Sequence, residues 1–114
     1  MKLHEEKISD VLVVRLEEPR LDNTVSSEFK TELLRLAETE GVQNVLVDLG
    51  KVDYADSSGL GALLFGHRQL KLNSGDLKLL NPTPKVQTLI RIAKLEDVLA
   101  VFDNENAAVE SFRD

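Results

Sequence analysis

Two adjacent serines, Ser57 and Ser58, stand where a buried-looking strand gives way to an apolar-periodic helix. A short hydroxyl side chain at such a junction usually caps the free backbone N–H groups of the first helical turn. One cap is enough, so we assign it to Ser58 and expect Ser57 to lie one step outside the helix. The Ser57 hydroxyl is then free to accept a phosphate, an anion that the helix dipole and free amides would stabilise at this position.

A phosphate on Ser57 would act as a switch for binding. It would add about −1.5 to −2 charge close to Asp53 and Asp56. A partner that docks at this helix end would then meet a bulky anion in place of a small neutral group. The same residues also fit a plain strand-to-helix turn in which a serine only caps, and the local sequence leaves both interpretations open.

Other site chemistries find little support. A serine hydrolase needs a base beside the nucleophile, and the histidines are His4 and His67. His67 lies about two helical turns or more from Ser57, outside hydrogen-bond range. The chain has neither G-x-S-x-G nor G-x-x-x-x-G-K-[ST], and its scattered acids and histidines predict no metal site. We therefore expect neither an enzyme nor a bound cofactor.

Charge and composition narrow the class of partner. The net charge is −6, with 20 acids against 14 bases, and aromatic residues make up 4% of the chain. A nucleic-acid surface needs clustered Lys and Arg, so we expect protein partners and no nucleic acid. No apolar run approaches the roughly 20 residues of a membrane span, and the absence of cysteine fits the cytoplasm. We expect one cytoplasmic domain over residues 1–114, as a monomer or weak homodimer.

The elements that position the serines follow from hydrophobic periodicity. We expect strands over residues 2–7, 11–16, 42–49, 77–80 and 99–102, and helices over residues 25–37, 59–71, 86–93 and 105–112. The order ββαβαβαβα predicts an α/β (mixed α+β) fold: a mixed central sheet of about five strands, with four helices and a hairpin at one edge.

Two glycines, Gly61 and Gly66, lie inside the predicted helix that follows the serines. Glycine is costly in a helix interior. We therefore expect close approach of another element at both positions, either the sheet or the backbone of a partner. Gly41 is placed to end the preceding helix in a left-handed conformation.

The run D-Y-A-D-S-S-G-L-G-A-L, preceded by V-L-V-D-L, closely resembles the anti-sigma factor antagonist family, the small free-standing members of the STAS domain group. The resemblance continues in Leu21-Asp22-Asn23-Thr24, in the turn and strand from Asn73 to Leu79, and in the helix from Val86 to Leu95. It covers nearly the whole chain and implies the STAS fold.

The resemblance implies a function by partner switching. In this family the first hydroxyl of the D-S-[ST]-G-L-G turn is phosphorylated, which corresponds to Ser57, with Ser58 as the alternative acceptor. The implied partners are an anti-sigma factor that is a serine kinase, and a serine phosphatase. The implied partner-binding residues are Asp22, Asn23, Thr24, Asp56, Ser57, Ser58, Gly59 and Leu60.

The resemblance leaves alternatives open. A STAS domain can also serve as a non-switching scaffold or as the partner of a lipid-transport assembly. The local sequence allows Asp22 to be a helix cap or turn former without a binding role. The chain also departs from the family at Glu18-Pro19 and at Lys94, positions where relatives often have glycine. Pro19 changes the loop near Asp22 and bears on the shape of the partner surface there.

Overall fold

The computed structural model describes residues 1–113, whose central element is a five-stranded sheet in the order β1-β2-β4-β6-β7. Its strands are β1 (Leu3–Ile8), β2 (Val11–Leu16), β4 (Asn44–Asp48), β6 (Asp76–Leu80) and β7 (Val101–Phe102). β1 pairs antiparallel with β2, and every other pair in this sheet is parallel. The predicted mixed sheet with a hairpin at one edge is therefore confirmed.

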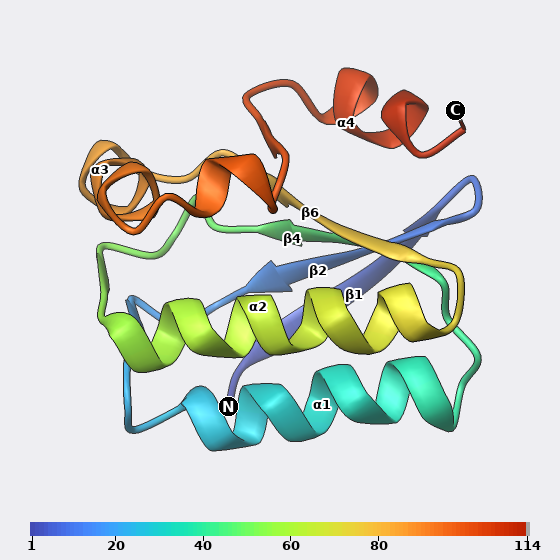
Figure 1. The fold of residues 1–114 in the computed structure, drawn as a ribbon, viewed down its shortest axis with the longest axis horizontal. Helices are drawn as coiled ribbons and strands as arrows, with labels where there is room; N and C mark the ends of the chain where they lie inside the picture. Colours follow the sequence, from blue (N-terminus) through green and yellow to red (C-terminus); the bar gives the residue numbers. More distant parts are fainter. Residues whose placement is uncertain (114) are drawn as a thin grey trace.

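Helices cover both faces of this sheet (Figure 1). They are α1 (Ser26–Glu38), α2 (Ser57–Leu72), α3 (Pro84–Ile92) and α4 (Glu105–Ser111), with a short 3₁₀ helix, η1 (Leu95–Asp97), after α3. α1 and α2 lie side by side below the sheet in this view, whereas α4 lies above it, on the opposite face (Figure 1). The four predicted helices are confirmed within residues 1–113, and η1 was not predicted.

The alternation of side chains along the strands builds two separate cores. In β4, Val45 and Val47 face the larger core, which they share with α1, α2 and α3. Leu46, between them, faces the smaller core, together with Ala108 and Val109 of α4. All three β4 side chains are fully buried, as expected for a central strand covered on both faces. This buried strand leads directly toward the start of α2.

β1 differs from the other strands of the sheet because most of its side chains are exposed. It runs along the outside of the hairpin and carries the charged residues Glu5, Glu6 and Lys7. Arg15 of β2 reaches back to Glu6, with 2.9 Å between Nη2 and Oε1. The hairpin turn contains Ser9, whose φ of +59° lies in the left-handed region.

The two glycines of α2 have different surroundings. A Cβ added at Gly66 would lie 2.5 Å from Cδ1 of Leu33 on α1 and 3.1 Å from Cδ1 of Leu77 on β6. The expected close approach is therefore confirmed at Gly66, where α2 packs tightly against α1 and the sheet. At Gly61 no other part of the described chain comes within 4 Å of such a Cβ. The expected contact within the chain is thus wrong at Gly61, which faces open space.

A second, two-stranded sheet pairs β3 (Arg20–Leu21) with β5 (Tyr54–Ala55) in parallel, with Leu21 opposite Ala55. The sequence did not predict this pairing. It joins the segment before α1 to the segment before α2, which are more than thirty residues apart in the chain. Both loops that carry predicted partner-binding residues are held together by this small sheet.

Candidate functional site

Asp56, not Ser58, caps helix α2. Its Oδ1 accepts a hydrogen bond from the backbone N–H of Gly59 at 3.0 Å, and α2 begins at Ser57. The predictions that Ser58 is the cap and that Ser57 lies outside the helix are therefore wrong. The physical reason is that a carboxylate at this position makes a charge-assisted hydrogen bond and also complements the positive end of the helix dipole. Ser57 is the first residue of the helix.

The two serines of the turn have different environments. Ser58 is half-buried, and its hydroxyl donates a hydrogen bond of 2.6 Å to Oδ1 of Asp56. Ser57 is exposed, and its hydroxyl makes no hydrogen bond to another residue among those the structure describes. The Ser58 hydroxyl and the Gly59 amide hold the pKa of the Asp56 carboxyl below its usual value, so this cap is ionised at neutral pH.

The small sheet brings the Asp22 loop to the serine turn. The backbone N–H of Asp56 donates to the carbonyl of Leu21 at 3.3 Å. The N–H of Asn23 donates to Oδ2 of Asp56 at 3.2 Å. One carboxylate therefore caps α2 with one oxygen and fixes the neighbouring loop with the other. The residues that the sequence predicted as a single surface do meet at the start of α2.

The predicted surface residues divide into an exposed group and a buried group. The first group is at least partly accessible to solvent and consists of the exposed residues Asn23, Thr24 and Ser57 and the half-buried residues Asp56 and Ser58. The second group is buried and consists of Asp22, Gly59 and Leu60. A partner that approaches from solvent can touch the first group directly. The second group shapes the backbone beneath it.

Asp22 forms a turn in the loop before α1. Its Oδ1 accepts hydrogen bonds from the hydroxyl and the N–H of Thr24, at 2.6 and 3.0 Å, and its Oδ2 accepts one from Nε of Arg20 at 2.9 Å. The Thr24 hydroxyl, with Arg20, holds the pKa of the Asp22 carboxyl at about 2, below its usual 3.8. No side chain caps α1 itself, whose N-cap residue is Val25. Of the two local interpretations of Asp22, the turn former fits.

We predict that the change Asp22→Asn destabilises the protein, and that the loss of unfolding free energy relative to wild type is larger at neutral pH than in acid. The depressed pKa means that ionised Asp22 stabilises the fold fully above about pH 4 and loses this contribution as the pH falls toward about 2. The difference in unfolding free energy between wild type and variant should therefore be largest at neutral pH and shrink across this window. Urea unfolding followed by circular dichroism at several pH values measures it.

The change Asp53→Asn is the matched control for the loss of one negative charge, because Asp53 is exposed and lies in the same region. A difference between wild type and Asp22→Asn that stayed constant from neutral pH to about 2 would contradict the assigned role of the Asp22 carboxylate.

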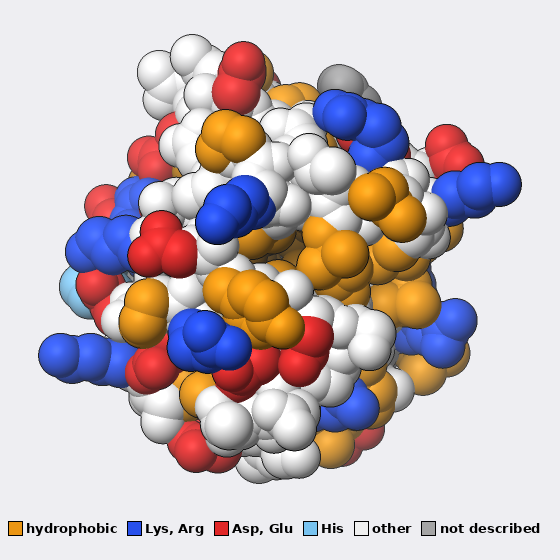
Figure 2. All heavy atoms as spheres, turned by 90° about the vertical axis from the view of Figure 1, so that its left-hand side faces the viewer, with side chains coloured by type: hydrophobic (Ala, Val, Ile, Leu, Met, Phe, Trp, Pro, Cys, Tyr) orange, Lys and Arg blue, Asp and Glu red, His pale blue; other side chains and the backbone are white. Residues whose placement is uncertain are grey.

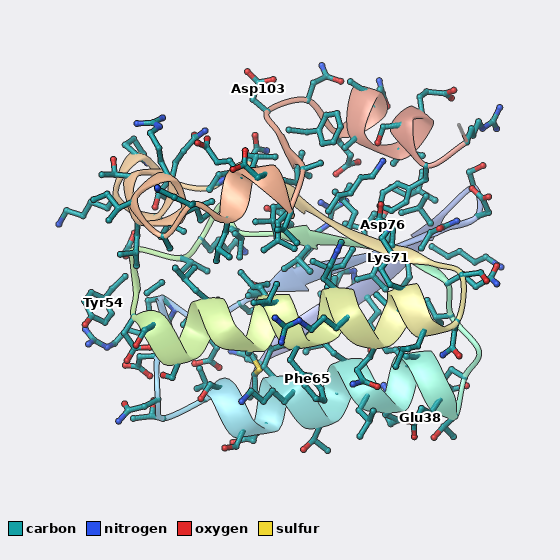
Figure 3. The ribbon with its side chains drawn as sticks, viewed as in Figure 1. Glu38, Tyr54, Phe65, Lys71, Asp76 and Asp103 are labelled. Carbon is teal, nitrogen blue, oxygen red and sulfur yellow. The ribbon has the colours of Figure 1, made fainter. Side chains whose placement is uncertain are left out.

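Sequence reasoning missed one feature of this end of the molecule, a stacked pair of Arg20 and Tyr54. The guanidinium carbon of Arg20 lies 4.2 Å from the centroid of the Tyr54 ring. The Tyr54 side chain, 44% exposed, projects beside the start of α2 (Figure 3). The sequence carries little sign of this contact, because only the parallel pairing of β3 with β5 places Arg20 opposite Tyr54.

Several kinds of site find no support in the described residues. Across residues 1–113 no group of three or more His, Asp or Glu is placed to hold a metal ion. No helix in that range has the length and apolar character that crossing a membrane requires. His67 is buried, with its Nδ1 3.2 Å from Oδ1 of Asp76, toward the far end of α2 from the serines. Figure 2 shows the end where α2 begins, with acidic, basic and hydrophobic side chains interleaved.

Comparisons with known proteins point to one family. The family model of the STAS domain matches residues 3–108. The anti-sigma F factor antagonist of Paenibacillus polymyxa is 27% identical over 101 residues, which cover 88% of this chain and 86% of that protein. The anti-sigma-B factor antagonist of Staphylococcus aureus is 32% identical over 79 residues, or 69% of this chain and 71% of that protein.

Solved structures share the fold. The anti-sigma factor antagonist SpoIIAA in its unphosphorylated form superposes with a TM-score of 0.83 at 23% identity, covering 98% of this chain and 96% of that one. The phosphorylated form of SpoIIAA, a Bacillus cell fate determinant, gives a TM-score of 0.73 at 22% identity, covering 96% and 98%. At these identities the likeness concerns the fold.

Proposed function

The chain belongs to the STAS domain family and, within it, to the anti-sigma factor antagonists, and from this premise we propose that it regulates transcription by partner switching in the cytoplasm. Unmodified, it binds an anti-sigma factor and thereby frees a sigma factor. Phosphorylated on Ser57, it is released. The chain is a substrate in this cycle and not itself an enzyme.

The proposed chemistry belongs to the partner. The anti-sigma factor acts as a serine kinase: the Ser57 hydroxyl oxygen attacks the γ-phosphorus of ATP, ADP leaves, and the hydroxyl proton passes to a base of the kinase. A serine phosphatase later hydrolyses the phosphoserine with water and restores the hydroxyl. This chain supplies the hydroxyl, its position at the start of α2, and the docking surface around it.

One observation carries the proposal: the Ser57 side chain is exposed and unbonded within the described chain, whereas Ser58 is tied to Asp56. A kinase can reach Ser57 without breaking any side-chain hydrogen bond of the fold. Phosphorylation of Ser58 would remove a donor from the carboxylate that caps α2 and fixes the Asn23 loop. The geometry therefore favours Ser57 as acceptor.

The charge of a phosphate supports release. At neutral pH it adds about −1.5 to −2 charge at the docking surface, beside the ionised Asp56. The first turn of α2 offers this anion free amides and the positive end of the helix dipole. The modified chain therefore keeps its fold, while the group that it presents at residue 57 changes from a neutral hydroxyl to an anion.

We predict that incubation with the cognate anti-sigma factor and ATP adds one phosphate, which tandem mass spectrometry places on Ser57. Ser57→Ala should abolish labelling, whereas Ser58→Ala should leave a labelled Ser57. Labelling that persists in Ser57→Ala and disappears in Ser58→Ala would transfer the role to Ser58. A protein that is never labelled and co-purifies with a transporter ATPase would contradict partner switching.

A further inference from the structure

An open apolar groove lies between the C-terminal half of α2 and η1, away from the serine turn. Its volume is about 670 Å³, and its apolar lining comes from Leu64 and Leu72 of α2 and from Leu95 and Val98 at η1. The side chain of Leu72 is 78% exposed and that of Val98 is 45% exposed. Exposed leucine and valine around one hollow are typical of a surface that binds another molecule.

The charges that line this groove are opposite in sign to those of the chain as a whole. The net charge is −6, yet the charged residues of the lining are Arg68 and Lys71, with no Asp or Glu among the described lining residues. Lys71 lies near Asp76, with 3.6 Å between Nζ and Oδ2. Arg68 is exposed and makes no ion pair within residues 1–113. An occupant with acidic side chains would pair with this free guanidinium.

The groove continues the surface that carries Ser57. Positions four and three residues apart in a helix share one face, and from Ser57 this face passes through Gly61 and Leu64 to Arg68 and Leu72. All five are exposed or half-buried. The open space at Gly61 leaves the α2 backbone accessible to a partner. Lys71 lies at the opposite end of α2 from Tyr54 (Figure 3). At 1.5 Å per residue, the face from Ser57 to Leu72 is about 22 Å long.

We propose that this groove binds an amphipathic helix of a partner protein, with an apolar stripe against Leu64, Leu72 and Val98 and acidic side chains against Arg68 and Lys71. The inference rests on the proposed function, because the helix belongs to the same anti-sigma factor that docks at Ser57. Laid along α2, the partner contacts the groove at one end and the phosphorylation site at the other.

A second copy of this chain fits the groove less well than an acidic helix does. A symmetric dimer places the same patch on both subunits face to face. Such a dimer would place two patches face to face whose charged lining residues are Arg68 and Lys71, and like charges in an interface are costly. An acidic amphipathic helix of a partner protein is therefore the better occupant.

The test uses a designed amphipathic peptide of about 18 residues, long enough to follow α2, with leucines at helical spacing and glutamates flanking them. A matched peptide replaces every glutamate with lysine. The glutamate peptide should shift amide resonances of α2 and η1, bind more weakly at high salt, and bind at least about tenfold more tightly than the lysine peptide. Equal binding of both peptides, or shifts confined to other elements, would overturn the inference.

The variant pair Leu72→Glu and Ile92→Glu separates the groove from general surface effects. Both are large apolar side chains at the surface: Leu72 is 78% exposed and Ile92 is 72% exposed. Leu72 lines the groove, whereas Ile92 does not. Leu72→Glu should weaken binding of the glutamate peptide and of the anti-sigma factor by at least about tenfold, whereas Ile92→Glu should not. Equal loss in both variants would overturn the inference, as would self-association that Leu72→Glu abolishes in sedimentation.

The same variants distinguish the groove from the switch. If a charge at Ser57 weakens anti-sigma factor binding while Leu72→Glu leaves it intact, the groove inference is wrong and the proposed function stands. If Leu72→Glu abolishes binding of the glutamate peptide while no Ser57 variant affects the anti-sigma factor, the proposed function is wrong and the preference of the groove for an acidic helix is supported.

Discussion

Replacing Ser57 with aspartate should weaken binding to the cognate anti-sigma factor by at least about tenfold, or 1.4 kcal/mol, without loss of folding. The carboxylate brings a fixed negative charge to an exposed site beside the Asp56 cap. A partner surface that accepts a neutral hydroxyl must then desolvate that charge without a counter-charge. Isothermal titration calorimetry with the purified partner measures the loss.

The matched control is Ser57→Asn, which has the size of aspartate and no charge. Its affinity should fall far less than that of Ser57→Asp, because only the steric part of the change remains. Thermal unfolding of Ser57→Asp should occur at or above the wild-type temperature, since an acidic residue in the first turn of a helix is stabilising. Equal affinities of the aspartate and asparagine variants would show that charge does not control release.

Replacing Gly59 with alanine should destabilise the protein by about 3 kcal/mol, at the upper end of the usual cost of overpacking. A Cβ at Gly59 would lie 2.0 Å from the carbonyl oxygen of Leu21 and 2.8 Å from its carbonyl carbon. These are backbone atoms of β3, so they cannot rotate away. The helix-propensity gain of alanine, about 1 kcal/mol at most, is too small to offset the clash.

The change Gly61→Ala in the same helix turn is the control. With no neighbour within 4 Å of its added Cβ, alanine should stabilise the protein by up to about 1 kcal/mol. Urea unfolding of wild type and both variants measures the two changes in unfolding free energy, which should have opposite signs. A Gly59→Ala protein as stable as Gly61→Ala would contradict the close packing of α2 on β3 and with it the architecture of the site.

The larger elements could be predicted because their periodicity is strong. The almost unbroken apolar run that contains β4 indicated a strand buried on both faces, and the structure places Val45 and Leu46 in separate cores. The stripe of Phe29, Leu33 and Leu36 indicated an amphipathic helix, and all three are buried in α1. Such patterns repeat over many residues, so one ambiguous position does not change the assignment.

The details of the site depend on single residues and were harder to predict. Asp56, Ser57 and Ser58 are all residue types that cap helices well, and the sequence alone does not say which of them is aligned with the Gly59 amide. The pairing of β3 with β5 involves two residues on each side, too few to give a period. The contact between Asn23 and Asp56 depends on that pairing and could not be foreseen without it.

Lys94 illustrates a departure that the structure explains. The family resemblance implies glycine at this position, and in this chain Lys94 adopts φ +58° and ψ +30° between α3 and η1. This left-handed conformation costs a side chain roughly 1–2 kcal/mol relative to the right-handed one. The backbone turn that follows α3 is thus retained without glycine, and it positions Leu95 and Val98 beside α2.

The exposed strand β1 has a consequence for solubility. An outer strand with unpaired backbone groups invites further strands to add to it, which is a common route to aggregation. Here that edge bears Glu5, Glu6 and Lys7, and adding an identical strand would desolvate their charges. Growth of the sheet through the β1 edge is therefore disfavoured.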